Sequence, residues 1–186
     1  MSGLSFQPVV HGSMVHIMGI QWPPPVRPGI DPFEREISLE IECLCGKISA
    51  TIHGHVPLQR ICHCRECKKI TGGTHGDFLL VRNNSMLTWR CNTAELKAFS
   101  YYVGEEETEN NVKNVFRCPT CCTPIFVGQG NPNSNIMLFF VGCLADPTWL
   151  DDHKPDSETF TGDRCAWLPL IAPPSAPSPG PQPKSE

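Results

Sequence analysis

Residues 62–72 read Cys62-His63-Cys64-Arg65-Glu66-Cys67-Lys68-Lys69-Ile70-Thr71-Gly72, which places three cysteines within six positions. A Cys-x-x-Cys pair on a tight turn brings two thiolates toward one ion, in the geometry of a zinc knuckle. Residues 66–71 have the composition of a short helix, and Gly72 is suited to end it. This stretch therefore predicts a metal-binding turn that leads directly into a short helix.

The whole chain is rich in cysteine, with eleven among 186 residues. Such a density indicates either a secreted disulfide framework or metal binding in a reducing compartment. The opening residues, MSGLSFQPVV, lack the basic and apolar segments of a signal peptide. Cysteines separated by one or two residues are also too close together to suggest structural disulfides. Metal binding in the cytoplasm is therefore the prediction.

Two further cysteine pairs resemble the first cluster in their spacing. One residue separates Cys43 from Cys45, and two residues separate Cys118 from Cys121. Residues i and i+2 of a strand face the same side, so Cys43 and Cys45 are expected to bind one ion together. The same argument applies to Cys62 and Cys64. Soft thiolates in tetrahedral sets favour zinc over magnesium or calcium.

The count of thiolates at ligand spacing is informative because it is seven: Cys43, Cys45, Cys62, Cys64, Cys67, Cys118 and Cys121. A structural zinc takes four ligands, whereas a catalytic zinc takes three and keeps a position for water or substrate. We therefore predict two Zn²⁺ ions per chain, one structural and one catalytic. Spacing alone does not decide which pairs combine, and Cys64, Cys67, Cys118 and Cys121 would also form a closed site.

The segments between the cysteines predict a mostly-β domain. Apolar and polar residues alternate over residues 37–45, and the alternation resumes at 48–52 after Gly46. Further apolar runs separated by turn residues predict strands at 78–81, 86–89, 99–103, 112–116, 125–127 and 136–141. Aromatic residues such as Phe139, Phe140 and Trp167 are expected in the core.

Both ends of the chain differ in composition from this domain. Residues 1–36 contain the run Trp22-Pro23-Pro24-Pro25 and further prolines, which block helices and central strands, so an irregular arm is expected. Residues 171–186 are rich in proline, serine and glycine and predict a disordered tail. The zinc domain is accordingly expected over residues 37–170.

The cysteine motifs together resemble a known family. They are similar to the signature of the glutathione-dependent formaldehyde-activating enzyme family, which also includes centromere protein V. The resemblance rests on Glu42-Cys43-Leu44-Cys45-Gly46, on residues 62–72, on Cys118-Pro119-Thr120-Cys121 and on Gly142 to Pro147, and it extends to Trp167. It implies a β-tent fold of short antiparallel sheets pinned by zinc. It also implies a structural ion at Cys43, Cys45, Cys118 and Cys121 and a second ion with an open position at Cys62, Cys64 and Cys67.

Four residues depart from the pattern of the family. Cys122 stands where the family usually has glycine, and it either accepts a strained backbone conformation or competes as a ligand. Glu158 stands near the place of a family histidine, and His75 and Asp77 replace uncharged residues. The last two are candidates for proton transfer because they follow the second cluster, although an ordinary polar loop is the more common meaning of such a pair. These departures leave the substrate open.

The chemistry expected of a zinc held by three thiolates is thiol binding. Its net charge of about −1 makes it a weaker Lewis acid than a zinc held by three histidines, so water activation is less natural. The resemblance implies that glutathione adds to formaldehyde, which is carbon–sulfur lyase chemistry in reverse. A larger electrophile such as a biosynthetic intermediate is a variant. The alternative is a non-enzymatic zinc scaffold of the centromere protein V kind.

The charge of the chain bears on its partners. The formal net charge is −4, which gives no electrostatic reason to expect nucleic acid. No apolar stretch approaches the length of a membrane span. Arg60, Arg65, Lys68 and Lys69 lie near the second cluster and could attract an anionic thiol such as glutathione, with a solvated surface as an equal alternative. His63 alternates away from its neighbouring cysteines, so we expect it to support them rather than to bind metal.

Overall fold

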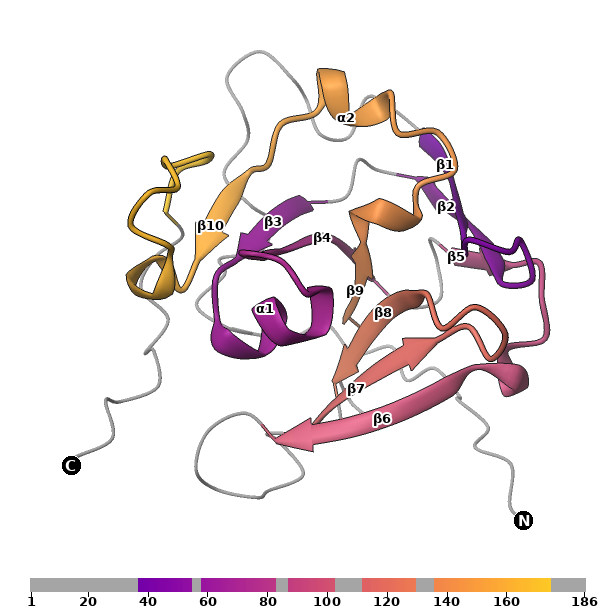
Figure 1. Cartoon of the computed structure of the whole chain (residues 1–186). Coiled ribbons are helices and arrows are strands. Elements are labelled where there is room, and N and C mark those ends of the chain that lie inside the picture. Colours follow the sequence, from indigo (N-terminus) through magenta and orange to yellow (C-terminus); the bar gives the residue numbers. More distant parts are fainter. Residues whose placement is uncertain (1–36, 55–57, 83–86, 103–111, 130–135, 175–186) are drawn as a thin grey trace, which may run out of the picture.

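The computed structural model describes residues 37–54, 58–82, 87–102, 112–129 and 136–174. The predicted N-terminal arm, residues 1–36, lies outside the described residues. Within them the chain is mostly β, as predicted, and it forms two sheets together with a few short helices (Figure 1).

The smaller sheet has three antiparallel strands in the order β1-β2-β5, with bounds Ile37–Glu42, Ser49–Gly54 and Leu87–Trp89. The larger sheet has seven strands in the order β10-β3-β4-β9-β8-β7-β6. Their bounds are Ser157–Thr159, Leu58–Cys62, Gly76–Arg82, Ile136–Phe140, Pro124–Gln129, Val112–Arg117 and Lys97–Tyr102. All the pairings in this sheet are antiparallel except β10 with β3. The helices are α1 (Arg65–Thr71), η1 (Thr93–Glu95), η2 (Val141–Cys143), α2 (Trp149–Asp152) and η3 (Thr161–Asp163).

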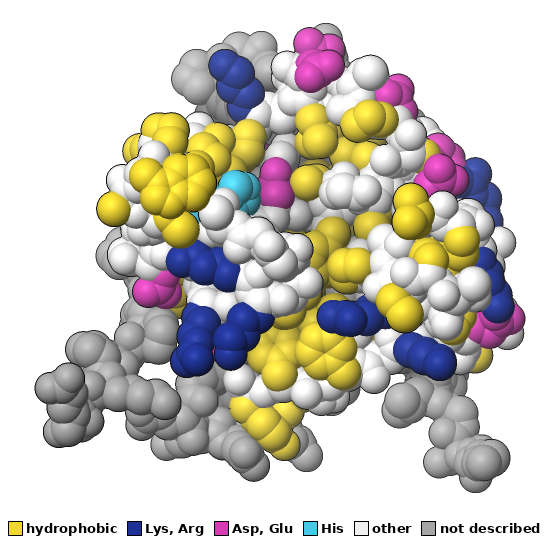
Figure 2. Space-filling view, in the orientation of Figure 1, with side chains coloured by type: hydrophobic (Ala, Val, Ile, Leu, Met, Phe, Trp, Pro, Cys, Tyr) yellow, Lys and Arg dark blue, Asp and Glu magenta, His cyan; other side chains and the backbone are white. Residues whose placement is uncertain are grey.

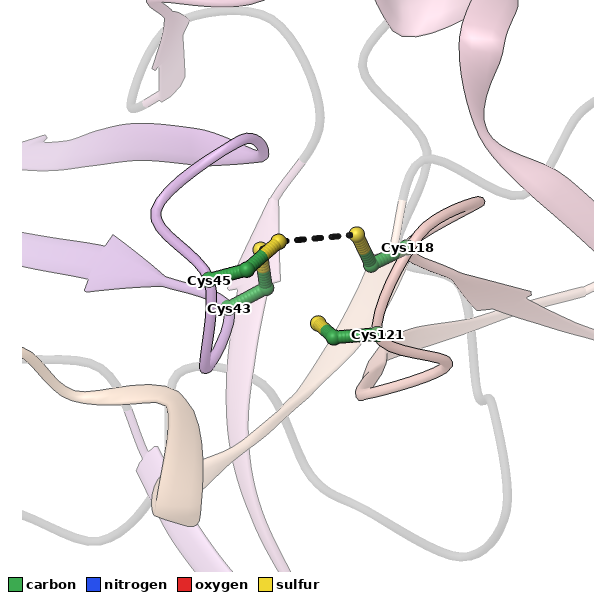
Figure 3. A group of neighbouring side chains, drawn as sticks. All are labelled: Cys43, Cys45, Cys118 and Cys121. Carbon is green, nitrogen blue, oxygen red and sulfur yellow. Dashed lines mark hydrogen bonds between the residues drawn. The ribbon is translucent and has the colours of Figure 1, made fainter.

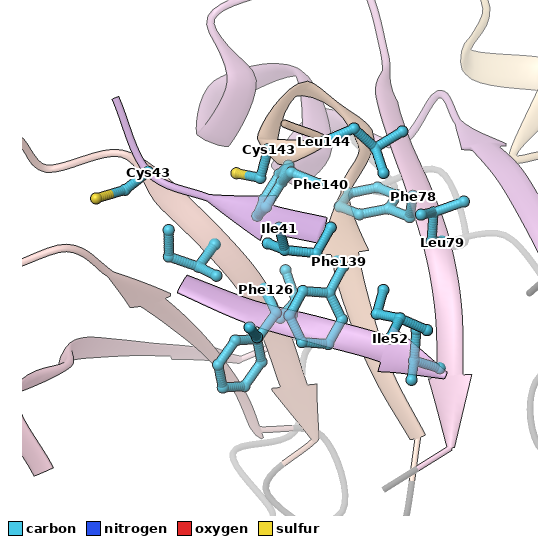
Figure 4. Close-up of a cluster of buried hydrophobic side chains, with 14 of the residues drawn as sticks. Ile41, Cys43, Ile52, Phe78, Leu79, Phe126, Phe139, Phe140, Cys143 and Leu144 are labelled. Atoms are coloured by element: carbon cyan, nitrogen blue, oxygen red, sulfur yellow. The ribbon is translucent and has the colours of Figure 1, made fainter. Parts of the chain in front are cut away.

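The core lies between the two sheets (Figure 4). Ile41 of β1 and Ile52 of β2 are buried, and they belong to the same cluster as Leu79 of β4 and Phe139 of β9. The alternation of apolar and polar residues explains the contribution of β1, because Leu39 and Ile41 face inward. Each fully buried side chain of this size stabilises the fold by about 1.5–3 kcal/mol. The core therefore joins the sheets along most of their length.

Two strands were not expected from the sequence. β3 and β10 are short and are buried on both faces, so neither shows a clear alternation of polar and apolar residues. The strand expected at 37–45 is also shorter in the structure, since β1 ends at Glu42. There the chain turns through Gly46, whose φ is +72° and whose N–H donates to the Cys43 carbonyl at 2.9 Å. Cys43 and Cys45 therefore meet on a turn, and strand periodicity was the wrong reason for grouping them.

The C-terminal part of the domain differs from expectation at two places. Trp167 was expected in the core, but it is 73% exposed and lies in a turn closed by the hydrogen bond from Leu168 N to the Cys165 carbonyl. Residues 171–174 return beside β10, where Ala172 is buried and Glu158 N donates to the Pro173 carbonyl at 3.0 Å. Packed structure thus continues beyond residue 170. In the described part of the chain, none of the helices combines the length and apolarity that crossing a bilayer requires.

Candidate metal centres

The first candidate centre contains four cysteines from two turns (Figure 3). Cys43 and Cys45 come from the turn after β1, and Cys118 and Cys121 come from the turn between β7 and β8. The four sulfurs lie within 4.8 Å of one another, with Cys45 Sγ 3.7 Å from Cys118 Sγ. This is the donor set of a closed tetrahedral zinc site. The alternative set that spacing left open, with Cys64 and Cys67, is not formed.

Backbone donors surround these sulfurs. Ile48 N donates to Cys43 Sγ at 3.3 Å, and Thr120 N donates to Cys118 Sγ at 3.4 Å. Burial acts to raise the pKa of Cys43, but the hydrogen bond from Ile48 and the contacts with neighbouring thiols outweigh it, so this pKa is lowered. The pKa of Cys121 falls to about 5, mainly through its hydrogen bond with the Thr123 hydroxyl. At Cys43 and Cys121 the turns therefore favour the thiolate form that a metal needs. The hydrogen bond with the Lys47 backbone acts to lower the pKa of Cys45, but desolvation and the contacts with Cys121, Cys43 and Cys118 outweigh it, so this pKa is instead raised to about 11.

Cys122 follows the last of these cysteines and is not part of the cluster. Its φ is 61°, which is the left-handed region that favours glycine, and its side chain is exposed. Of the two alternatives for Cys122, the described structure shows the strained backbone conformation. The turn takes this shape because Cys122 N donates to the Cys118 carbonyl at 3.1 Å.

The second candidate centre contains three cysteines. Cys62 is the last residue of β3, Cys64 is the N-cap of α1, and Cys67 lies in the first turn of that helix. Their sulfurs lie within 4.8 Å of one another, and Cys64 Sγ accepts from Cys67 N at 3.4 Å. Cys64 and Cys67 are buried, whereas Cys62 is partly exposed. A helix N-terminus, rather than the strand periodicity assumed from the sequence, thus brings Cys62 and Cys64 together.

Close packing beneath this cluster depends on Gly76. It pairs with Cys62 across β3 and β4. A Cβ atom added to Gly76 would lie 3.2 Å from Cys67 Cβ and 2.6 Å from the Phe78 ring. A side chain at this position would displace the Phe78 ring and crowd Cys67, so glycine lets β4 pass close to α1.

The three thiols influence one another strongly. Hydrogen bonds from Cys64 and Cys67 lower the pKa of Cys62 to about 3. The pKa values of Cys64 and Cys67 are raised, first because each lies against the sulfur of Cys62. Without a metal, Cys62 is therefore the thiolate of the group, and Cys64 and Cys67 remain thiols that donate hydrogen bonds to it. Three converging sulfurs fit zinc well, since the ion relieves the repulsion among three thiolates. Among the described residues no fourth Cys, His, Asp or Glu joins this group.

His63, which separates Cys62 from Cys64, is fully buried and faces away from them. Its Nε2 lies 2.8 Å from Oε2 of Glu158, which is also fully buried. Oε1 of Glu158 accepts hydrogen bonds from Ile171 N and from Ala172 N. His63 N also donates to the Thr159 carbonyl at 3.1 Å. The sequence predicted the supporting role of His63 but gave no sign that Glu158, 95 positions away, is its partner.

His75 and Asp77 lie on the other face of the sheet from Cys62. Residues paired directly across antiparallel strands share a face, so Cys62 shares its face with Gly76, and Asp77, the next residue of β4, projects the opposite way. His75 immediately precedes β4, and its ring lies 5.7 Å from the ring of His63. Asp77 accepts from Gln59 Nε2 at 3.1 Å, and burial raises its pKa to about 6. The structure does not bring the two candidates for proton transfer to the sulfur cluster.

Comparison with known proteins agrees with this arrangement. The profile of the family described as glutathione-dependent formaldehyde-activating enzyme matches residues 38–163, which contain both cysteine clusters. The chain belongs to this family. The family is linked to the glutathione-dependent activation of formaldehyde, and two cysteine clusters of this chain can hold zinc.

The chain was also compared with individual curated sequences and solved structures. No curated protein sequence matches the chain significantly. Among solved structures, a Rhodobacter sphaeroides protein from a structural genomics programme is 17% identical and superposes with a TM-score of 0.43. The superposition covers 60% of this chain and 94% of the other.

Proposed function

We propose that this chain is a zinc-dependent carbon–sulfur lyase that joins glutathione, or a similar thiol, to formaldehyde or a larger electrophile. The observation that carries the proposal is the number of ligands in the second cluster. Three sulfurs converge there, and the described residues supply no fourth ligand, whereas the first cluster is complete with four. A closed structural zinc and an open catalytic zinc differ in this way.

The residues divide the work between the two centres. Cys43, Cys45, Cys118 and Cys121 would hold the structural Zn²⁺, and Cys62, Cys64 and Cys67 would hold the catalytic one. When bound there, zinc would lower the pKa of a substrate thiol that completes its coordination. In the overall reaction the thiol sulfur bonds to the carbonyl carbon, and the carbonyl π electrons pass to oxygen. The thiol proton ends on that oxygen as a hydroxyl, and the lyase direction reverses each change.

The protein side chains orient this chemistry. Cys62 is the partly exposed member of the cluster, so we place substrate entry on its side. The buried His63–Glu158 pair holds the backbone between Cys62 and Cys64. We assign His75 and Asp77 an indirect role, in which they act from the opposite face on the position of His63 and Gly76. A reducing compartment such as the cytoplasm suits eleven free cysteines.

The test combines metal content, cobalt spectroscopy and turnover in the full-length protein. We expect two zinc ions per chain and faster exchange between free glutathione and its hydroxymethyl adduct, measured by NMR. In cobalt-substituted protein, glutathione should shift the spectrum of one ion and leave the other unchanged. Cys64→Ser should abolish the exchange, and Cys165→Ser, which changes a cysteine outside both clusters, should leave it intact.

The scaffold alternative gives a different result. Two zinc ions whose cobalt spectra both ignore thiols would mean that the second site is closed in the protein. Unchanged exchange in Cys64→Ser would equally remove the proposed mechanism. A larger natural electrophile would instead leave the thiol response intact and give slow turnover of formaldehyde alone.

A further inference from the structure

A buried arginine lies on the same face of the sheet as the three-cysteine centre. Arg60 precedes Cys62 by two positions in β3, so their side chains project to the same side. Pairing with β4 confirms this face, since Arg60 is opposite Phe78 and Cys62 is opposite Gly76. The Arg60 side chain is only 8% exposed, which is rare for arginine. Its charge lies close enough to interact with those of Cys62 and Asp156.

The guanidinium of Arg60 has one neutral partner in the described part of the chain. Its Nε donates to the Ser157 hydroxyl at 3.3 Å, across the parallel pairing of β3 with β10. No carboxylate of the described residues lies within ion-pairing distance of the Arg60 guanidinium, although the charges of Cys62 and Asp156 act on it from farther away. The hydrogen bond to Ser157 uses only Nε, and the described residues offer no hydrogen-bond acceptor to the two terminal nitrogens. A buried guanidinium with no anion in direct contact is only partly compensated by the charges of Cys62 and Asp156, so the site favours an anionic ligand.

We propose that Arg60 binds a carboxylate of the thiol substrate and so selects thiols that carry one. The inference rests on the proposed function, because it places the thiol sulfur beside Cys62. Residues i and i+2 of a strand are roughly 7 Å apart, so one thiol of the size of a short peptide can span the sides of Cys62 and Arg60 together. The two terminal guanidinium nitrogens suit a carboxylate through two parallel hydrogen bonds.

This assignment separates Arg60 from the other cations nearby. Arg65 and Lys69 are exposed on α1, and the Nζ of Lys68 donates to the Asp163 carbonyl. On the face of the molecule drawn in Figure 2, Lys and Arg side chains lie at several separate places on the surface, where solvent screens them. Such exposed charges attract anions without selecting among them. A buried guanidinium is fixed in position and works in a less polar environment, so it can discriminate between substrates.

Calorimetric titration of the zinc-loaded full-length protein tests this selection. Glutathione, its diethyl ester and 2-mercaptoethanol are compared, because the last two are thiols without a free carboxylate of glutathione. We expect glutathione to bind about 10- to 100-fold more tightly than its diester. Arg60→Gln should remove most of that preference, Arg60→Lys should keep part of it, and Lys69→Gln should preserve it. Binding of 2-mercaptoethanol should be the same in all four proteins.

The outcomes that overturn the inference differ from those that overturn the proposed function. Equal affinity of the wild-type protein for glutathione and its diester would refute carboxylate selection, even if no Arg60 variant folds. Equal weakening of all three thiols in Arg60→Gln would show that Arg60 serves only as a counter-ion of the three-thiolate centre. If none of the thiols binds to the wild-type protein, the proposed function fails together with this inference. If the wild-type protein binds only the two thiols that lack a free carboxylate, the inference about Arg60 fails and the proposed function stands.

Discussion

Cys122 shows how a single residue can oppose the turn that it occupies. A side chain at a φ of 61° costs about 1–2 kcal/mol relative to glycine, and Cys122 is exposed, so it gains little packing in return. Cys122→Gly should therefore raise the free energy of unfolding by about 1 kcal/mol after the greater freedom of glycine in the unfolded chain is subtracted. Chemical denaturation measures the gain, and Cys122→Ala, which keeps Cβ, should show none. A loss of one zinc ion from Cys122→Gly would instead reveal a ligand.

Asp77 should make stability depend on pH in mildly acidic solution. Burial raises its pKa from 3.8 to about 6, so between these values the folded protein binds more protons than the unfolded chain. The stabilising contribution of the protonated Asp77 side chain is fully present below about pH 4 and is lost as pH rises through about 6. Relative to Asp77→Asn, the wild type should lose up to about 3 kcal/mol of unfolding free energy over this interval. Chemical denaturation of both proteins at a series of pH values measures the difference in unfolding free energy. Effects of zinc release are common to the two proteins and cancel in this difference. A constant difference would contradict the burial argument.

At the scale of elements, the Glu158 carboxylate joins three segments that are distant in sequence. It lies on β10, contacts His63 at the start of the metal-binding turn, and accepts hydrogen bonds from Ile171 and Ala172. Removing one partner of a buried pair typically costs about 3–5 kcal/mol. We expect Glu158→Ala to lose stability in this range and to weaken metal binding at the three-cysteine site by about 10- to 100-fold.

A double-mutant cycle with His63→Ala separates the pair from its other contacts. The two changes should be less than additive, and amide exchange at Ala172 should accelerate only when Glu158 is replaced. Glu95→Ala is a matched control because its ion pair with Lys47 is on the surface and contributes little. Full additivity would mean that His63 and Glu158 act independently.

The elements also show which parts of the structure can be predicted from sequence. The strands at 37–42 and 49–54 carry an alternating pattern, and the strand at 112–117 coincides with a predicted apolar run. Both cysteine clusters follow from ligand spacing and the family resemblance. β3 and β10 could not be predicted, because strands buried on both faces have no alternation and because β10 is only three residues long. The opposite faces of Cys62 and Asp77 depend on the register of β3 with β4, which the sequence does not specify.

For the whole molecule, the two centres have different structural weight. Cys43 and Cys45 follow a strand of the three-stranded sheet, whereas Cys118 and Cys121 connect two strands of the seven-stranded sheet. The first centre therefore fastens the sheets together, in addition to the core between them. The second centre is contained within β3 and α1, which are adjacent along the chain. Loss of a ligand should consequently have a global effect at the first centre and a local effect at the second.

Cys118→Ser and Cys64→Ser provide a matched test of this difference. Binding of a structural zinc contributes on the order of 10 kcal/mol to folding, which is as large as the stability of most domains. Cys118→Ser should therefore fail to show a cooperative thermal transition, whereas Cys64→Ser should remain folded with one zinc ion per chain and lose its thiol response. Circular dichroism during heating and metal analysis provide the two readouts. Equal losses of structure in the two variants would mean that the three-cysteine centre also holds the fold together, because α1 and β4 would then depend on its metal for their packing at Gly76.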